Sequence, residues 1–310
     1  MNCRKSGFVL VSVLWVTAIL TVLAIGFGRR AMIDRRAATV SVDYVRVRAE
    51  ARGQVQEGAA EIVNTMALFA LLKRGSLNYP IPQFQFKEAP EPKVIGEKGN
   101  RTIEDMAYFT IEDEERKIAI NAASEEMLES IPGLTFSMVN QIIRRRGGES
   151  ADDEVTPFQS IEEIRQLDGI SDDDWYGDED DPGLRDVITL WGDGKININT
   201  ASAAVLRLIP ELDEEIVEGI ILHRSGADGE LGTEDDVQFR GMPNVMNILE
   251  ISAERIQPLR EFAKIQSSYF RVTGVATLRG GKVRASTTAV IGIDGGAAEV
   301  LRWSEDSPRG

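Results

Sequence analysis

The sequence predicts an α+β protein in which a long N-terminal helix packs on a small antiparallel sheet and a large α-helical domain is inserted. Three observations support this prediction. Apolar residues recur at helical spacing from residue 8 to about residue 75, strand-like segments lie at 106–117 and 267–293, and a helical pattern occurs twice between them. A chain of 310 residues can bury such a core without disulfides.

Composition and charge narrow the classes of function. The chain has 50 acidic and 35 basic residues, a formal net charge of −15, which disfavours a general affinity for nucleic acid or anionic membrane surfaces. Its one cysteine, Cys3, precedes the apolar segment, so no internal disulfide can form. The compartment of the protein must therefore be inferred from other features.

The first element is an apolar segment long enough to cross a membrane. Residues 8–28 carry no charge and, at about 1.5 Å per helical residue, cover roughly the 30 Å of a hydrocarbon core. A secretory signal has a shorter apolar region and a small-residue cleavage site, whereas this segment ends in Gly-Phe-Gly-Arg-Arg. We expect a transmembrane helix. Basic residues lie on both flanks, and counting them alone would place the long C-terminal part in the cytoplasm.

The same helix is expected to continue beyond the membrane. From Ile33 to Phe69, apolar residues recur every three or four positions and form one face, with charged residues on the opposite face. Gly53 and Gly58 weaken the helix, by about 1 kcal/mol each relative to alanine. Gly75 and the two prolines that follow it end the helix. A plain anchor followed by a juxtamembrane helix would have the same architecture.

The start of the chain resembles the precursors of type IV pilin-like proteins. In that family a short basic leader ends in glycine, and a Phe or Met followed by an apolar helix comes next; here Arg-Lys-Ser-Gly precedes Phe8. The resemblance implies that residues 1–7 are a prepilin leader, that a prepilin peptidase cuts between Gly7 and Phe8, and that Phe8 is then N-methylated. Residues 8–28 would be the transmembrane part of the helix and residues 29–75 its periplasmic part.

Position five of the expected mature chain departs from the usual pilin pattern. Most family members have glutamate there, and this chain has Ser12. A glutamate in an apolar helix bundle can neutralise the α-amine of a neighbouring subunit, because an unpaired charge there is costly. The K-type minor pseudopilins of the type II secretion pathway resemble this chain in lacking the acid, and are thought to lie first, at the tip. A chance serine or a non-pilin anchor would give the same residue.

An internal repeat occupies the middle of the chain. Residues 117–146 and 195–224 align without a gap at an offset of 78 residues. Each copy predicts a helix with a serine N-cap, a proline-containing turn and a second helix, with Ser124 and Ser202 as the caps. The sequence therefore predicts two related α-helical hairpins.

The predicted strands lie on both sides of this repeat. K-type pseudopilins have a large helical domain inserted into a pilin-like head, and the order of elements here resembles theirs. The resemblance implies an inserted α-helical domain at residues 117–261. The pilin-like α/β head would be formed by residues 76–116 and 262–310.

The repeated hairpins also share features with the helix-hairpin-helix module of DNA-binding proteins. That module holds phosphate with backbone amides of a Gly-hydrophobic-Gly turn, usually beside basic residues. The two copies have Pro-Gly-Leu-Thr and Pro-Glu-Leu-Asp instead, so neither has the second glycine. We expect no nucleic-acid partner, and the alternative is a membrane-anchored protein for DNA binding and uptake.

An acidic loop between Gly226 and Phe239 is the best candidate for a binding site. Acidic residues alternate with glycines there, and calcium prefers six to eight oxygen ligands. The spacing differs from that of an EF-hand, and a solvated loop would carry the same charges. K-type pseudopilins bind calcium in the inserted domain, so the resemblance implies a calcium site. A second acidic run, at 171–181, could supply another ligand set for the same ions, but we interpret it as a solvated loop. The candidate metal ligands are Asp228, Glu230, Asp235 and Asp236.

The sequence gives little indication of catalysis. His223 is the single histidine and ends a repeated helix, and cleavage after Gly7 would remove the single cysteine. The resemblance implies a non-enzymatic minor pseudopilin that initiates or caps the pseudopilus tip for protein export across the outer membrane; a membrane-anchored hydrolase is a rival. It also implies a single-pass inner-membrane protein of a Gram-negative bacterium with its globular part in the periplasm. The implied partners are the H-, I- and J-type minor pseudopilins and prepilin peptidase.

Overall fold

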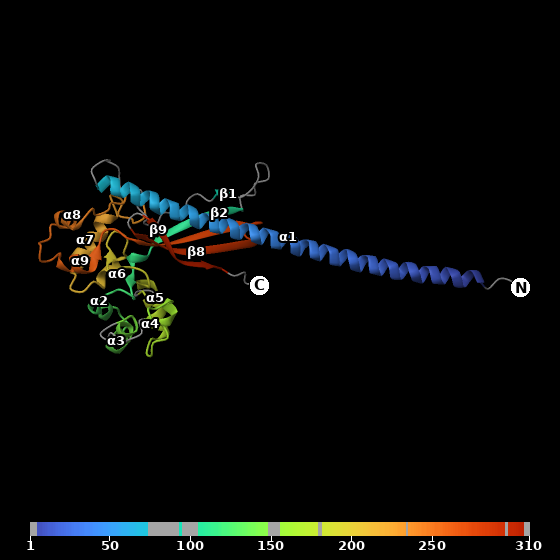
Figure 1. Cartoon of the computed structure of the whole chain (residues 1–310), viewed down its shortest axis with the longest axis horizontal. Helices are drawn as coiled ribbons and strands as arrows, with labels where there is room; N and C mark the ends of the chain where they lie inside the picture. Colours follow the sequence, from blue (N-terminus) through green and yellow to red (C-terminus); the bar gives the residue numbers. More distant parts are fainter. Residues whose placement is uncertain are drawn as a thin grey trace.

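The longest element of the computed structural model is helix α1 (Lys5–Lys73), which extends from one end of the molecule into a globular head (Figure 1). The N-terminal half of this helix projects away from the head, and its C-terminal half lies against it. The predicted continuous helix is therefore confirmed. The structure describes residues 5–73, 93–94, 105–147, 156–178, 182–233, 235–294 and 297–306.

A five-stranded sheet with antiparallel pairings forms the core of the head. β7 and β8 form the predicted hairpin, in which Leu278 pairs with Val283 around the Gly-Gly turn. Side chains of successive residues alternate between the two faces of the sheet, and only one face contacts α1. The strands, in spatial order, are β1 (Lys93–Val94), β2 (Met106–Asp113), β7 (Tyr269–Leu278), β8 (Val283–Asp294) and β9 (Ala297–Glu305).

The predicted apolar face of α1 is buried only where the helix meets this sheet. Its buried side chains, Val47, Ala51, Val55 and Ile62, pack against apolar residues of β7 and β8. A Cβ atom added to Gly58 would lie 2.5 Å from Cγ1 of Val272, and one added to Gly274 would lie 2.2 Å from the carbonyl oxygen of Ala51. The glycines therefore allow the helix and the sheet to approach closely.

Two glycines of α1 offer a matched test of this packing. A Cβ atom at Gly53 would meet nothing within 4 Å, whereas one at Gly58 would overlap Val272. We expect Gly53→Ala to raise the free energy of unfolding by about 0.5–1 kcal/mol, because alanine is the better helix former. Gly58→Ala should lower it by about 1–3 kcal/mol through overpacking. Urea denaturation of the chain in detergent micelles measures both, and changes of equal sign would contradict the close contact.

Ion pairs also fix α1 to the edge of the sheet. Arg52 donates two hydrogen bonds to the carboxylate of Glu305 on β9, at 2.7 and 3.0 Å, and Arg48 contacts the same carboxylate. The hydrogen bonds from Arg52, Trp303 and Arg48 lower the pKa of Glu305 to about 2, and the bond from Arg52 has the largest effect. Asp43 forms a further pair with Arg279 in the turn between β7 and β8.

The lowered pKa of Glu305 predicts a specific dependence on pH. A carboxylate whose pKa is lower in the folded state stabilises the protein above its unfolded pKa, and this contribution is lost as pH falls through the folded value. We expect the thermal midpoint of the wild type to exceed that of Glu305→Gln at neutral pH, and the difference to shrink between about pH 4.5 and pH 2. Thermal melts across this range measure it; a difference that did not change with pH would contradict the assignment.

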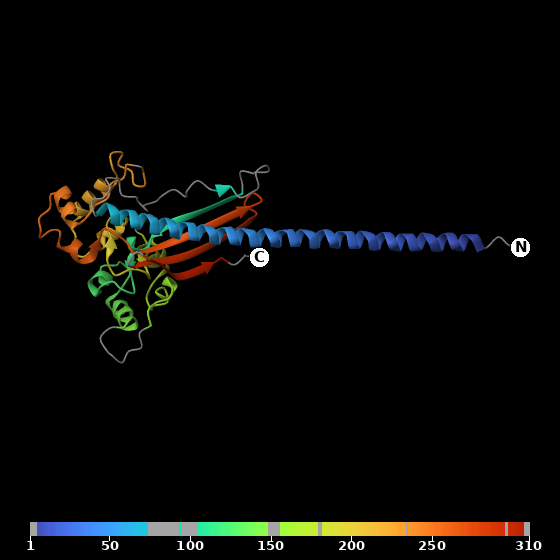
Figure 2. The same ribbon diagram turned by 45° about the horizontal axis from the view of Figure 1, so that its top comes forward.

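The inserted domain leaves the sheet at the end of β2 and returns at the start of β7, which is the neighbouring strand (Figure 2). The predicted hairpins and caps are confirmed, since the Ser124 hydroxyl accepts a hydrogen bond from the Met127 amide and the Ser202 hydroxyl from the Val205 amide. The two hairpins consist of α2 (Glu125–Glu129) with α3 (Phe136–Arg145), and α6 (Ala203–Arg207) with α7 (Glu214–Arg224).

The structural repeat is longer than the aligned sequences. Each copy begins with one strand of a short parallel pair and ends with the second strand of that pair. The second copy therefore continues to Lys264, beyond the expected boundary at 261. The pairs are β3 (Ile118–Ala119) with β4 (Ile188–Thr189), and β5 (Ile196–Asn197) with β6 (Ala263–Lys264). The remaining elements are η1 (Glu114–Arg116), η2 (Ile161–Glu163), α4 (Asp172–Tyr176), α5 (Leu184–Val187), α8 (Met242–Leu249) and α9 (Gln257–Phe262).

One asparagine closes each copy in the same way. The Asn121 side chain donates to the carbonyl oxygens of Phe158 and Leu190 and accepts from the Phe158 amide. The Asn199 side chain makes the equivalent three bonds: it donates to the carbonyl oxygens of Phe239 and Ile265 and accepts from the Phe239 amide. Each copy is therefore a helical unit held by one asparagine side chain, half-buried in the first copy and buried in the second, and the two units share one apolar core.

Candidate functional site

The N-terminal half of α1 is the largest exposed apolar surface of the described chain. Large apolar side chains from Leu10 to Val45 remain exposed, among them Trp15 at 66% and Phe27 at 71%. The helix is long and apolar enough to cross a membrane, with a mean hydropathy of 2.4 in its most apolar window. A continuous apolar surface of this size requires lipid or other apolar helices around it. Gly7 and Phe8 lie at the start of α1, and Ser12 lies exposed on it.

A second site, at the junction between the head and the inserted domain, was missed by sequence reasoning. Asp113, the last residue of β2, is 3% exposed. One carboxyl oxygen accepts hydrogen bonds from Asn197 at 3.0 Å, Thr200 at 2.5 Å and Ser267 at 2.6 Å, and the other accepts from the Glu115 amide at 2.9 Å. Burial raises the pKa of Asp113, against the opposing effect of these donors. The carboxyl group thus joins β2 to both ends of the second copy.

The two glutamates after Asp113 extend this junction. Glu114 contacts Thr189 of the first copy and Arg271 of β7. Glu115, which is fully buried, contacts Lys264 and accepts hydrogen bonds from the amides of Asp193 and Ser268. Burial raises the pKa of Glu115, while the adjacent Lys264 lowers it. Three consecutive acids therefore fix both copies of the inserted domain to the sheet.

The predicted calcium loop is held by its own backbone in the structure. Asp235 accepts hydrogen bonds from the amides of Ala227 and Asp228, at 2.6 and 3.1 Å, and from the Thr233 hydroxyl at 2.7 Å. These bonds, with that of Thr233 first, lower the pKa of Asp235 to about 2. Asp236 accepts from the Gly232 amide at 2.8 Å.

The geometry of this loop differs from that of a formed metal site. Asp228 accepts a hydrogen bond from the amide of Glu230, so its carboxylate also serves the loop. Within the described part of the chain, no three acidic, histidine or cysteine side chains are placed to hold a metal ion. The donor oxygens have the right chemistry for a hard cation, and completing a site would take further oxygen ligands besides these side chains. A carboxylate oxygen that accepts one amide keeps a second lone pair for a cation, and calcium binding stays a prediction.

The second acidic run is partly helical, so its interpretation as a loop was wrong for residues 172–176. These residues form α4, where the Ser171 hydroxyl accepts from the Asp174 amide and Asp174 accepts from the Ser171 amide, a capping box. Asp172 pairs with Arg165 at 2.6 Å. Burial of Trp175 explains why this polar segment packs as a helix. Residues 179–181 of the run lie outside the described residues.

The single histidine and the arginine after it contribute to packing of the second copy. The His223 ring lies 4.4 Å from the Phe239 ring, and burial lowers its pKa. Arg224 is fully buried and donates to the carbonyl oxygen of Ala201 at 2.5 Å, and burial lowers its pKa to about 10. Arg146 makes the equivalent bond to Ala123 in the first copy. Arg224 and Arg146 therefore have the same structural role in the two copies of the repeat.

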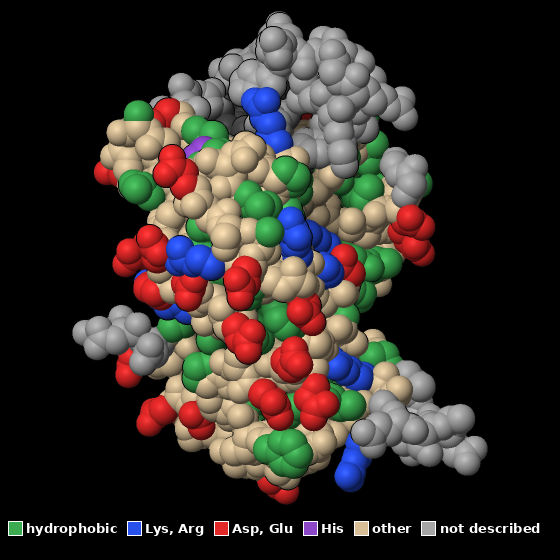
Figure 3. Space-filling model, turned by 90° about the vertical axis from the view of Figure 1, so that its left-hand side faces the viewer, with side chains coloured by type: hydrophobic (Ala, Val, Ile, Leu, Met, Phe, Trp, Pro, Cys, Tyr) green, Lys and Arg blue, Asp and Glu red, His purple; other side chains and the backbone are tan. Residues whose placement is uncertain are grey.

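A groove of about 840 Å³ next to the turn of the second hairpin is strongly acidic. Figure 3, which views the end of the molecule opposite the N-terminus, shows acidic side chains over much of this end face. Phosphate bound at the turn of the second hairpin would lie beside these carboxylates, so the arrangement disfavours nucleic-acid binding there. The acidic residues lining the groove are Glu126, Glu129, Glu211, Asp213, Glu254 and Glu261.

The structure is similar to a chain in the crystal structure of the GspK–GspI–GspJ complex from the type 2 secretion system of enterotoxigenic Escherichia coli. The match covers 85% of this chain and 99% of that chain, with a TM-score of 0.50 and 12% sequence identity. No protein-family model and no curated protein matches this sequence. The likeness extends over almost the whole length of that chain and is one of overall fold. The chain therefore has the fold of a protein from this secretion complex.

Proposed function

We propose that this chain is a minor pseudopilin of a type II secretion system, a non-enzymatic protein that assembles with other minor pseudopilins. The observation that carries the proposal is the exposed apolar half of α1 joined to a head with this fold. The basic leader ending in Gly7 supports it further, because cleavage there leaves the apolar helix in the mature protein. In this proposal α1 spans the inner membrane first and then packs against the helices of its partners, with the head in the periplasm.

The inserted domain and Ser12 support a position at the tip of the pseudopilus. The domain widens the head on the side away from the exposed part of α1 (Figures 1 and 2), which suits a terminal subunit better than a repeating one. A tip subunit has no earlier neighbour whose α-amine needs a carboxylate, so a serine at this position is tolerated. The tip subunit would initiate or cap the assembly.

Co-expression with the H-, I- and J-type minor pseudopilins of the same host tests the proposal. The full-length chain in detergent should co-purify with them in a defined complex. A chain without residues 8–28 should lose most of this association, because the apolar helix would no longer contribute. A chain that stays alone in both forms would contradict the proposal. Duplex DNA binding with a steep salt dependence would instead support the DNA-uptake alternative.

We also propose that calcium binds the loop around Asp235 and stabilises the folded domain. The hard oxygen donors and the local excess of negative charge support this. We expect calcium to raise the thermal midpoint relative to EDTA, and Asp235→Asn to reduce this shift more than Asp186→Asn, an exposed position outside the loop. Equal midpoints with calcium and EDTA would contradict a calcium site.

A further inference from the structure

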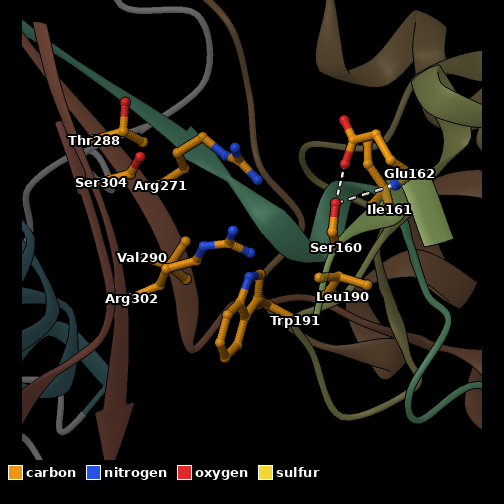
Figure 4. A pocket seen from close by; sticks show the side chains of 10 residues that line it. All are labelled: Ser160, Ile161, Glu162, Leu190, Trp191, Arg271, Thr288, Val290, Arg302 and Ser304. Atoms are coloured by element: carbon orange, nitrogen blue, oxygen red, sulfur yellow. Dashed lines mark hydrogen bonds between the residues drawn. The ribbon is translucent and has the colours of Figure 1, made fainter. Parts of the chain in front are cut away.

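A pocket of about 270 Å³ lies where the sheet meets the first copy of the inserted domain (Figure 4). One wall is a row of paired residues on three neighbouring strands: Arg271 on β7, Val290 on β8 and Arg302 on β9. This row lies on the face of the sheet away from α1, because the adjacent residues of β7 and β8 pack on the helix. Ser160 and Trp191 of the inserted domain form the opposite wall.

Two guanidinium groups enter this space from the same wall (Figure 4). Arg271 is paired through Nε with Glu114, whose other carboxyl oxygen accepts a hydrogen bond from Thr189. Arg302 donates from Nη1 to the backbone carbonyl oxygen of Gln159 at 2.6 Å, which is a neutral acceptor. Two cations separated by one strand repel each other, and an anion between them would offset this repulsion.

The remaining lining groups suit a small oxyanion. Thr288 and Ser304 bring hydroxyl groups that can donate hydrogen bonds. The hydrogen bond from Ser160, with a smaller contribution from Arg302, lowers the pKa of Glu162, so its carboxylate is charged and offsets part of the positive charge of Arg302. A guanidinium group presents a planar pair of donors that matches the two oxygens of a carboxylate. At roughly 30 Å³ per water molecule, the pocket has space for about nine waters, which admits a carboxylate on a short carbon chain.

We propose that this pocket binds a carboxylate, carried either by an acidic side chain of a neighbouring protein or by a free dicarboxylate ion. The site goes beyond the proposed assembly through α1, because it uses the opposite face of the sheet. A chain with a net charge of −15 repels anions in general. The two arginines would therefore attract an anion at this pocket and not elsewhere on the surface around it.

Isothermal titration of the full-length chain in detergent tests the site. The probes are succinate and a short glutamate-containing peptide, with its glutamine counterpart as the uncharged comparison. We expect one probe per chain, with affinity lowered at least tenfold by Arg302→Gln and less by Arg302→Lys, which keeps the charge but not the planar donor pair. The matched control is Arg284→Gln, on the same strand and sheet face as Val290 but six residues, roughly 20 Å, away.

The outcomes separate the sources of the carboxylate. Binding of the glutamate peptide but not succinate assigns the pocket to a protein partner, and binding of succinate alone assigns it to a free ion. Equal losses in Arg302→Gln and Arg284→Gln would overturn the proposal, because general electrostatics would then explain the binding. Failure of the wild type to bind either probe would also overturn it. Urea midpoints of the variants exclude a loss caused by unfolding, and Arg302→Lys provides the test if Arg302→Gln does not fold.

Discussion

Replacing Asp113 with alanine is expected to lower the free energy of unfolding by about 2–4 kcal/mol. The substitution leaves Asn197, Thr200 and Ser267 without their shared acceptor in a buried place. Each buried donor without a partner costs about 1–3 kcal/mol, and rotation of the two hydroxyl groups recovers part of this. Urea denaturation of the full-length chain in micelles measures the change.

The same variant should also loosen the inserted domain from the sheet. Limited proteolysis should therefore cut near Asp113 and Ser267 faster in Asp113→Ala than in the wild type. The matched control is Asp186→Ala, which removes an exposed carboxylate of the inserted domain, and it should change stability by less than about 0.5 kcal/mol. Equal effects of the two substitutions would mean that the buried junction does not hold the domains together.

The second large effect is expected at the leader. Gly7→Val should abolish removal of residues 1–7 in a host with prepilin peptidase, because a β-branched side chain would lie directly before the expected cleavage point. The uncut chain keeps Arg4 and Lys5 at the end of its apolar helix, and these charges oppose entry into a helix bundle. Secretion that depends on this protein should then be lost. The size of the chain on gels and the export of a reporter substrate measure both results.

A glycine elsewhere in the same helix provides the control for this prediction. A Cβ atom at Gly28 would meet nothing within 4 Å in the chain itself, and Gly28 lies outside the leader, so Gly28→Val should be cut after Gly7 like the wild type. Export that persists with an uncut Gly7→Val chain would separate cleavage from function and contradict the proposed assembly.

Local sequence signals were sufficient to predict most of the fold. Ser124 and Ser202 stand before short helices, and their caps form as expected because the bond joins residues three apart. The Gly-Gly turn likewise specifies the β7–β8 hairpin from adjacent residues. The acidic run beginning at Ser171 was harder, since its charges suggested a loop, while the cap and the burial of Trp175 produced α4.

The junction and the pocket could not be predicted, because their partners are distant in the sequence. Asp113 bonds to residues 84–154 positions away, so its Asp-Glu-Glu run is indistinguishable from a solvated charge run until the topology is known. Arg271 and Arg302 become neighbours only through the register of three strands. The repeat carries one signal of a different kind: Asn121 and Asn199 occupy equivalent positions in the two copies and make equivalent bonds in the structure.

Mass spectrometry of the protein isolated from its own membrane tests the central claim most directly. If α1 survives maturation as the stalk of an assembling pseudopilin, the N-terminal peptide should begin at Phe8, carry one methyl group on its α-amine and continue through the apolar segment. A chain that begins at Met1, or one that has lost the whole segment from Phe8 to Gly28, would contradict this account.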